Sequence, residues 1–337
     1  MKSRTTFVLA ARAAAAAIAL AALTACSNSH HDPLEKYYLV TPNTKAAYWQ
    51  EGWAGFNHAA FVMGAGVQAA LAGPDTFDPQ AEVQEFRTVM SLKPTGILVS
   101  AGDAAAMKGP IDAAIALGIP VITVDSDVPD SKRLTFIGTN NYQAGVMGGR
   151  VLVERLHGKG DIVVYTLAGQ VNAGERLRGY KSVLDGHPQI KIVRTVDVKG
   201  DPRIAFDSTV EITKGKPIPD GFICLVAVAC PEVADVLDRN NIQNKVIVAM
   251  DTPSDTLDWI KKSRIAATIS QKPYTMGQFG ILMLDALHHY KLPRLDANWA
   301  QDIHSPFPAF IDTGATLIDQ TNLDAFRKAQ SASGGGA

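Results

Sequence analysis

Asp125 and Asp127 end the segment VITVDSD, which spans residues 121–127 and places two carboxylates directly behind an apolar run. A short apolar and β-branched run is typical of a buried parallel strand. Open α/β sheets hold their ligands at the carboxyl ends of the strands. Two carboxylates at such a strand end suit acid–base catalysis, metal binding, or the binding of an unchanged ligand through hydrogen bonds. The rest of the sequence has to distinguish these three kinds of site.

Further polar and aromatic residues follow predicted strands along the chain, and together they suit a neutral ligand that carries hydroxyl groups. Carboxylates accept hydrogen bonds from pairs of hydroxyls, while arginine, asparagine and glutamine offer planar donors. An indole or phenol ring covers the apolar face of a sugar ring. The candidate ligand-binding residues are Tyr48, Trp49, Asp125, Ser126, Thr139, Asn172, Arg176, Asp251 and Gln271.

The motifs of common catalytic, metal and cofactor sites do not fit this sequence. It contains no G-x-S-x-G segment and no histidine directly after a predicted strand, so a hydrolase triad finds no support. It contains no H-x-x-x-H or C-x-x-C pair that would hold a metal. Residues 64–69, GAGVQA, match the dinucleotide fingerprint by letter, but a predicted helix precedes them and a predicted strand follows, which is the reverse of the required order. We expect no catalysis, no metal and no cofactor.

Composition and charge indicate an ordinary globular chain. The 337 residues are 47% hydrophobic and 19% charged, which leaves room for two domains. The formal net charge is −1, and no basic stretch occurs after the first dozen residues. Nucleic-acid binding requires a basic surface, so we expect no nucleic-acid partner.

Predicted strands and helices alternate from Tyr37 onward, in two sets of similar length that meet near residues 138–142. Alternation of this kind predicts parallel sheets with right-handed crossovers. The sets meet at Gly138-Thr139-Asn140-Asn141, a turn-rich segment rather than a long linker. The predicted fold is therefore α/β, with two doubly wound parallel-sheet lobes and a cleft between them.

The amino terminus has the features of an export signal. Lys2, Arg4 and Arg12 precede an apolar run over residues 13–23 that is too short for a permanent membrane span. Leu23-Thr24-Ala25-Cys26 resembles a bacterial lipobox, which implies lipidation of Cys26 and a place in the cell envelope, with membrane contact through the lipid anchor only. The following segment, SNSHHDPLE, is expected to be a solvated tether, so we interpret its two histidines, at 30 and 31, as linker residues rather than ligands.

Cys224 and Cys230 bound the segment CLVAVAC. In an exported protein two cysteines at this spacing permit a disulfide between a strand end and a helix start. They are equally compatible with two small buried apolar side chains. Both interpretations stay open at this point.

Four segments together resemble the type I periplasmic solute-binding proteins of the ribose-binding class, which feed ABC transporters. They are GIPVITVDSDVPDSKRLTFIGTNNYQAG (118–145), NAGERLRGY (172–180), VIVAMDTPSD (246–255) and ATISQKPYTMG (267–277). The resemblance covers roughly residues 36–325 and implies two lobes joined by three hinge crossings, near residues 139–141, 271–273 and 303–306. Combined with the export signal and with the Ser- and Gly-rich end, the resemblance gives the following expected division: signal peptide 1–25, lipidated tether 26–35, first lobe 36–139 with 272–304, second lobe 140–271 with 305–326, and a disordered tail 327–337.

The resemblance assigns ligand contacts to individual residues. The family's carboxylate after the fourth strand falls on Asp125, its arginine on Arg176, its second aspartate on Asp251 and its hinge glutamine or asparagine on Gln271. The family's aromatic pair falls on Tyr48-Trp49. Two departures alter the expected ligand set: Ala46-Ala47 stand where relatives have Asn-Pro, and Val226-Ala227 stand where relatives have Asn-Asp.

The function that the resemblance implies is capture of a small sugar or polyol between the lobes and its delivery to an ABC transporter permease. The protein is expected to be a monomer and not an enzyme. A chemosensory or furanosyl quorum-signal receptor of the same fold is the alternative. Under either function Asp125 accepts hydrogen bonds from the ligand and Asp127 is a loop residue.

Overall fold

The computed structural model describes residue 31 and residues 35–64, 66–290, 292, 294–295 and 298–334. The predicted signal peptide, Cys26 and most of the predicted tether lie outside the described residues. Within the described ranges, no helix combines the length and the apolar character that a membrane span requires.

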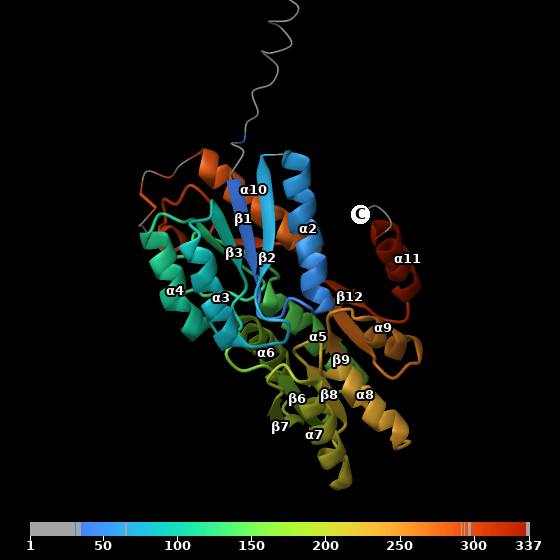
Figure 1. Ribbon diagram of the computed structural model, residues 1–337. Helices are drawn as coiled ribbons and strands as arrows, with labels where there is room; N and C mark the ends of the chain where they lie inside the picture. Colours follow the sequence, from blue (N-terminus) through green and yellow to red (C-terminus); the bar gives the residue numbers. More distant parts are fainter. Residues whose placement is uncertain are drawn as a thin grey trace, which may run out of the picture.

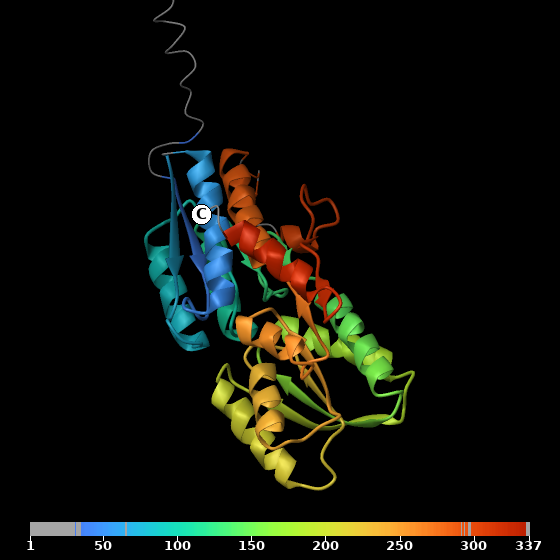
Figure 2. The ribbon, with the colours of Figure 1, turned by 90° about the vertical axis from the view of Figure 1, so that its right-hand side faces the viewer.

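The chain forms two lobes, each built around a six-stranded sheet (Figures 1 and 2). The first sheet has the order β11-β5-β4-β3-β1-β2 and the second the order β12-β10-β9-β8-β6-β7. The strands of the first sheet are β1 (Glu35–Val40), β2 (Val67–Ala72), β3 (Gly96–Val99), β4 (Val121–Val124), β5 (Phe136–Gly138) and β11 (Phe310–Asp312). The strands of the second are β6 (Gly160–Thr166), β7 (Ile190–Asp197), β8 (Gly221–Cys224), β9 (Val246–Met250), β10 (Ala267–Ser270) and β12 (Thr316–Ile318). Neighbouring strands are parallel except β12, which is antiparallel to β10.

Helices join the strands as crossovers, as the alternation predicts. The first lobe contains α2 (Ala47–Met63), α3 (Pro79–Ser91), α4 (Ala104–Ala116), α10 (Pro273–His289) and the short 3₁₀ helix η1 (Trp299–Gln301). The second contains α5 (Asn141–Arg155), α6 (Val171–Leu184), α7 (Pro202–Lys214), α8 (Cys230–Arg239), α9 (Ser254–Lys261) and α11 (Leu323–Gly334). Aspartate side chains accept backbone N–H groups at the start of α3, α4 and α7, which fixes where each helix begins after its loop.

The second sheet is covered by apolar side chains on both faces, which explains the apolar runs in its sequence. Along β6, Val163 and Tyr165 belong to one hydrophobic cluster, whereas Ile162 and Val164 belong to another. Successive side chains of a strand point to opposite faces, so the two clusters are the two faces of this sheet. A strand buried on both faces reads as continuous hydrophobicity rather than as alternation.

The chain passes between the lobes three times. Strand β5 ends at Gly138 and α5 begins at Asn141; later β10 ends at Ser270 and α10 begins at Pro273. The third passage lies farther along the chain than the 303–306 expected from sequence, because β11 pairs with β5 over three residues of the first sheet. It therefore lies between Asp312 and Thr316, where the Thr313 amide donates to the Gly138 carbonyl (2.8 Å) and ties the passage to the first.

The predicted disordered tail over 327–337 is wrong for its first part. Helix α11 continues to Gly334, and it is held by Leu323, which is buried, and by an ion pair from Arg327 to Asp258 (2.7 Å). The ion pair connects α11 to α9 in the second lobe. A small apolar contact at the helix start and one charge pair order a segment whose composition alone resembles a linker.

Candidate functional site

Two aspartates occupy equivalent strand ends in the two lobes. Asp125 follows β4 and Asp251 follows β9, and each of these strands is third in the order of its sheet. Both residues have left-handed backbones, with φ of 59° and 66°. Aspartate adopts this conformation more readily than most residues, and backbone strain of this kind concentrates at ligand sites. The sharp turn ends the strand and directs the carboxylate away from the sheet.

Asp125 accepts a hydrogen bond from each of the two lobes. The Tyr48 hydroxyl, from α2 of the first lobe, donates to Oδ1 of Asp125 (2.7 Å). The Asn172 amide, from α6 of the second lobe, donates to Oδ2 (3.1 Å). Both oxygens of the carboxylate therefore accept hydrogen bonds from neutral donors, a hydroxyl from the first lobe and an amide from the second.

Asp127 has a different role, although it lies two residues away. Arg133 donates to both of its oxygens, from Nε and Nη2, at 2.6 Å each. The Thr123 hydroxyl and the Val128 amide also donate to Oδ1. The guanidinium is in turn bonded to the Ala309 carbonyl (3.2 Å), so the pair fastens the loop after β4 to the segment before β11. Asp127 thus holds the loop and does not face a ligand.

Arg176 lies at the centre of a polar network in the second lobe, and its side chain is buried. Its Nε donates to the Asn141 side chain (2.8 Å), Nη1 to the Leu225 carbonyl (2.7 Å) and Nη2 to the Gln271 side chain (3.1 Å). Three acceptors from α5, the end of β8 and the second hinge passage hold the planar guanidinium in one orientation.

Two glycines allow α5 and α6 to come close enough for this network. A Cβ on Gly145 of α5 would lie 2.0 Å from the Arg176 carbonyl, and one on Gly179 of α6 would lie 2.1 Å from the Tyr142 carbonyl. Only glycine permits backbones to approach so closely. This contact places Asn141 at the start of α5 within reach of Arg176.

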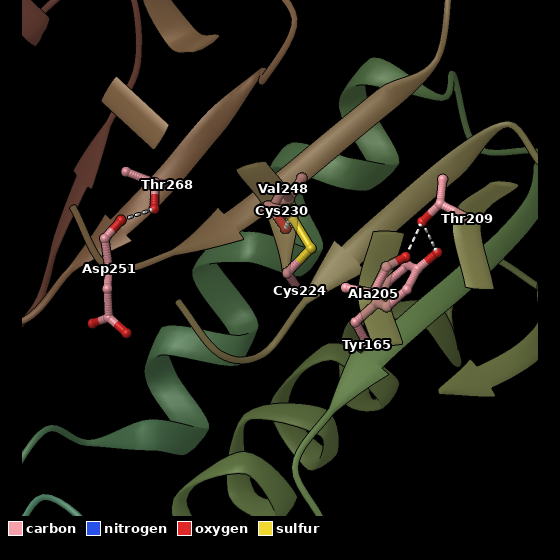
Figure 3. The surroundings of a disulfide bond; sticks show 8 residues. All are labelled: Tyr165, Ala205, Thr209, Cys224, Cys230, Val248, Asp251 and Thr268. Atoms are coloured by element: carbon pink, nitrogen blue, oxygen red, sulfur yellow. Dashed lines mark hydrogen bonds between the residues drawn. A yellow bond between two sulfur atoms is a disulfide. The ribbon is translucent and has the colours of Figure 1, made fainter. Parts of the chain in front are cut away.

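Gln271 connects the arginine to Asp251. Its Oε1 accepts from Arg176, and its Nε2 donates to Oδ1 of Asp251 (2.8 Å). The Thr268 hydroxyl donates to the Asp251 carbonyl (2.6 Å), which supports the left-handed turn (Figure 3). The amide orientation that serves both neighbours places the oxygen toward the cation and the NH₂ group toward the anion.

Burial and charge shift the ionisation of this site. Burial raises the pKa of Asp125 to about 6, against the lowering effects of the Arg176 charge and the Tyr48 hydrogen bond. Burial likewise raises the pKa of Asp251, again opposed by Arg176 and by Gln271. The pKa of the Tyr48 hydroxyl is raised by burial and by both carboxylates, so it remains a hydrogen-bond donor at neutral pH. The positive charge of Arg176 thus favours the ionised form of both buried carboxylates.

These shifts predict that ligand affinity depends on pH. Ligand hydroxyls that donate to Asp125 favour its ionised form, so binding lowers the pKa of Asp125 and releases a proton. Affinity is then full above pH 7 and falls as the pH drops through about 6. At pH 5 we expect affinity about 10-fold weaker than at pH 7.5 by calorimetry. An affinity unchanged between these two values would contradict ligand binding to the ionised Asp125.

A cavity of about 880 Å³ opens between the lobes at this site. Tyr48, Asp251 and Gln271 line it, whereas Asp125, Asn172 and Arg176 lie behind them in the hydrogen-bonded network. Ligand pockets of this size commonly combine apolar walls with a few fixed polar groups. The chain has both.

Three further residues expected at the ligand do not line the cavity. Trp49 is buried in the hydrophobic core of the first lobe and contacts Tyr48 edge to face, at 5.1 Å between ring centres. Consecutive residues of α2 point about 100° apart, so only one ring of the pair reaches the cavity. Ser126 and Thr139 are also buried at their strand ends and are absent from the cavity lining that the described residues form. Trp49 therefore packs in the core, whereas the buried hydroxyls of Ser126 and Thr139 have no hydrogen-bond partner among the described residues, and a ligand contact at these two stays a prediction.

The structure adds three residues to the site. Asn141 orients Arg176, and Glu51 and Phe77 line the cavity from the first lobe. Burial and the nearby Asp251 charge raise the pKa of Glu51. Sequence contained a signal for two of them: Glu51 is three residues after Tyr48 on one helix face, and Phe77 follows the strand β2.

Cys224 and Cys230 form a disulfide between the end of β8 and the start of α8 (Figure 3). Of the two interpretations left open by sequence, the structure has the bonded one. The disulfide closes a loop whose Ala227 and Val228 line the cavity and whose Leu225 carbonyl accepts from Arg176. Val226 is buried, so the segment that replaces the expected Asn-Asp presents an apolar wall to the cleft.

In the part of the chain that the structure describes, the grouping of metal-ligand side chains lies away from this cavity. It consists of His31, Glu35, Asp285 and His289, and Glu35 begins β1, at the amino end of the strand. The cavity lies at the carboxyl ends of the strands. The site therefore offers hydrogen bonds and ring contacts to a ligand.

Comparison with known proteins agrees with this geometry. The periplasmic binding protein domain matches residues 37–291. The ribose import binding protein of Bacillus subtilis is 24% identical over 221 residues, which is 64% of this chain and 70% of the relative. The D-apiose import binding protein of Paraburkholderia graminis is 29% identical over 182 residues, 52% of this chain and 56% of the relative.

Solved structures show the same architecture over nearly the whole described chain. A Burkholderia graminis ABC transporter solute-binding protein in complex with D-arabinose has a TM-score of 0.78 and 27% identity, covering 87% of this chain and 98% of its own. The arabinose-binding protein AraP of Geobacillus stearothermophilus has a TM-score of 0.70 and 30% identity, covering 87% and 99%. The chain therefore belongs to the periplasmic binding protein family.

Proposed function

We propose that this protein is an extracytoplasmic sugar-binding component of an ABC importer, that its ligand is an aldopentose, and that the sugar binds between the lobes. The observation that carries the proposal is the pair of hydrogen bonds to Asp125, one from each lobe. Sugar hydroxyls that replace these donors would bridge the lobes. A ligand with more contacts in the closed arrangement shifts the population toward it, and a permease recognises that form.

The network already has the groups that such a ligand needs. Asp125 and Asp251 supply acceptors, Asn172 and Gln271 supply donors, and the guanidinium of Arg176 orients Gln271 between the two charges. The aromatic ring of Tyr48 lies at the cavity wall. A neutral polyhydroxylated ring satisfies this set without a net charge of its own.

The curated relatives support a pentose, whereas one similar solved structure is named as a glucose-galactose binding protein. Ribose, apiose and arabinose are named for the binding proteins to which this chain is similar. The apolar loop over Val226 and Ala227 removes two side chains that could bond hydroxyls, so the pentose that binds best is expected to leave one of its hydroxyls without a partner on this side.

A thermal-shift screen tests the proposal. At a sugar concentration 100 times its Kd, binding stabilises the protein by about 2.7 kcal/mol, which raises Tm by about 4 °C in a chain of this size. D-Arabinose, D-ribose and D-apiose are the first ligands, with hexoses and polyols as the comparison set. Stabilisation by hexoses or polyols alone would contradict the pentose assignment, and no shift with any sugar would contradict sugar binding.

The proposal includes lipidation of Cys26. It also includes a monomeric mature protein, because recognition takes place in the cleft of one chain. The lipobox-like segment supports the lipid anchor. Expressed in a bacterium, the wild-type protein is expected to partition into the detergent phase, and the Cys26→Ser variant into the aqueous phase. Equal partitioning of the two proteins into detergent would contradict an anchor at Cys26.

A further inference from the structure

Four metal-ligand side chains meet at the base of the first lobe, at the opposite end of β1 from the cavity. They are His31, which precedes β1; Glu35, its first residue; and Asp285 and His289, one turn apart near the end of α10. One ligand atom from each lies within 4.8 Å of the other three. Two imidazoles and two carboxylates are a donor set that suits zinc.

The distances fit a tetrahedral ion. Ligands about 2.0–2.1 Å from a tetrahedral zinc lie about 3.3–3.4 Å from one another. Nε2 of His289 is 3.4 Å from a carboxylate oxygen of Glu35 and 3.4 Å from Oδ1 of Asp285. Nε2 of His31 is 3.1 Å from the same Oδ1. These three distances between ligand atoms are thus close to the edge length of a tetrahedral zinc site.

The surroundings favour a divalent cation. The Glu35 side chain is 3% exposed, and those of His31, Asp285 and His289 are between 12% and 17% exposed. Two carboxylates buried together repel each other and lose their hydration, and a metal ion compensates both costs. The Tyr37 hydroxyl donates to Asp285 (3.3 Å), which is the kind of outer hydrogen bond that orients a ligating carboxylate.

We propose that His31, Glu35, Asp285 and His289 bind one zinc ion. The ion fastens the segment before β1 to the carboxyl-terminal end of α10. If Cys26 is lipidated as proposed above, this site sets where the tether leaves the lobe, because only four residues lie between the lipidated cysteine and His31. His31 was predicted to be a linker residue, because its partner Asp285 lies 254 positions away in the sequence.

Zinc binding to the purified protein from residue 27 onward, prepared without an affinity tag, tests the site. Titration with zinc sulfate against a competing chelator is expected to give one zinc per chain. His31→Ala and His289→Ala are each expected to weaken zinc binding by about 100-fold or more. His31 precedes the first strand, so its removal leaves both sheets complete. The matched control is His304→Ala, which removes an exposed histidine from a loop and is expected to bind zinc like the wild type.

Cobalt substitution supplies a second readout, because tetrahedral cobalt absorbs visible light strongly and the signal is expected to disappear in His31→Ala. Wild-type zinc affinity in both histidine variants would overturn the proposal, as would a wild-type protein that binds no zinc, since the cluster would then be a set of histidine–carboxylate ion pairs. Sugar affinity measured with and without zinc is expected to be equal. Loss of sugar binding therefore reports on the cleft, and loss of zinc binding on this site.

Discussion

Replacing Arg176 with alanine is expected to weaken pentose binding about 30- to 1,000-fold, which corresponds to about 2–4 kcal/mol. The side chain donates to Asn141, Leu225 and Gln271 and provides the positive charge that favours ionised Asp125 and Asp251. Its removal leaves buried acceptors without donors and two carboxylates without a cation, and hydrogen bonds to charged groups are worth about 1.5–3 kcal/mol. Calorimetry with the best pentose from the screen measures the loss.

The unfolding free energy of the ligand-free Arg176→Ala variant shows whether Arg176 also stabilises the fold, apart from its role in ligand binding. An arginine that met solvent in an open cleft would change the stability of the ligand-free protein by less than about 1 kcal/mol on truncation. The partners of Arg176, however, belong to the second lobe and its hinge passage, so opening the cleft does not hydrate them. We therefore expect Arg176→Ala also to lower the ligand-free stability, by about 1–3 kcal/mol in urea.

Arg176→Lys is the matched control, because it keeps the charge and loses the planar fork that reaches three acceptors. Its affinity is expected between those of the wild type and the alanine variant. Pentose affinity at the wild-type level in Arg176→Ala would remove this residue from the account of the site.

Asp125→Asn and Asp127→Asn are expected to have opposite effects, although the two residues are two positions apart. Asp125→Asn is expected to weaken pentose binding about 30- to 100-fold, because a charged acceptor becomes a neutral amide. Asparagine tolerates the left-handed backbone at this position, so the turn is kept. The pKa of Asp125 is raised to about 6, so loss of its charge leaves the ligand-free stability at pH 7.5 unchanged or raises it, by up to about 3 kcal/mol.

Asp127→Asn breaks a buried bidentate pair with Arg133. It is expected to lower the unfolding free energy by about 2–4 kcal/mol and to change pentose affinity by less than about 3-fold. Measuring both quantities on both variants in one buffer makes each variant the control for the other. Equal losses of affinity would show that the loop after β4 acts as one unit, against the separate roles that the hydrogen bonds assign.

The two lobes could be predicted from sequence because the central strands of both sheets are buried. Such strands appear as uninterrupted apolar runs, and helices between them require parallel pairing. The carboxyl end of each run then identified Asp125 and Asp251 without any tertiary information. The left-handed backbone at both positions was not visible, since no glycine marks it.

What sequence could not supply was pairing across long distances. Strand β11 pairs with β5, which lies more than 170 residues earlier in the chain. Because of this pairing, the third passage between the lobes comes after Asp312 and not at the expected residues 303–306. Trp49 was predicted at the ligand because the family's aromatic pair falls on Tyr48-Trp49, yet the helical turn directs the Trp49 ring into the core. Asn141 was missed because its role depends on the close contact of α5 and α6 that Gly145 permits.

A crystal structure of the mature protein with the best-binding pentose would show whether Asp125 and Asp251 hold the sugar between the lobes. The sugar is predicted between the lobes, with a hydroxyl on a carboxylate oxygen of Asp125, a second on Asp251, and the Tyr48 ring beside it. The hydrogen bond from Asn172 to Asp125 would be replaced by contacts of each side chain with the sugar. A sugar bound at another surface, or one in the cleft with no contact to either aspartate, would contradict sugar binding by Asp125 and Asp251.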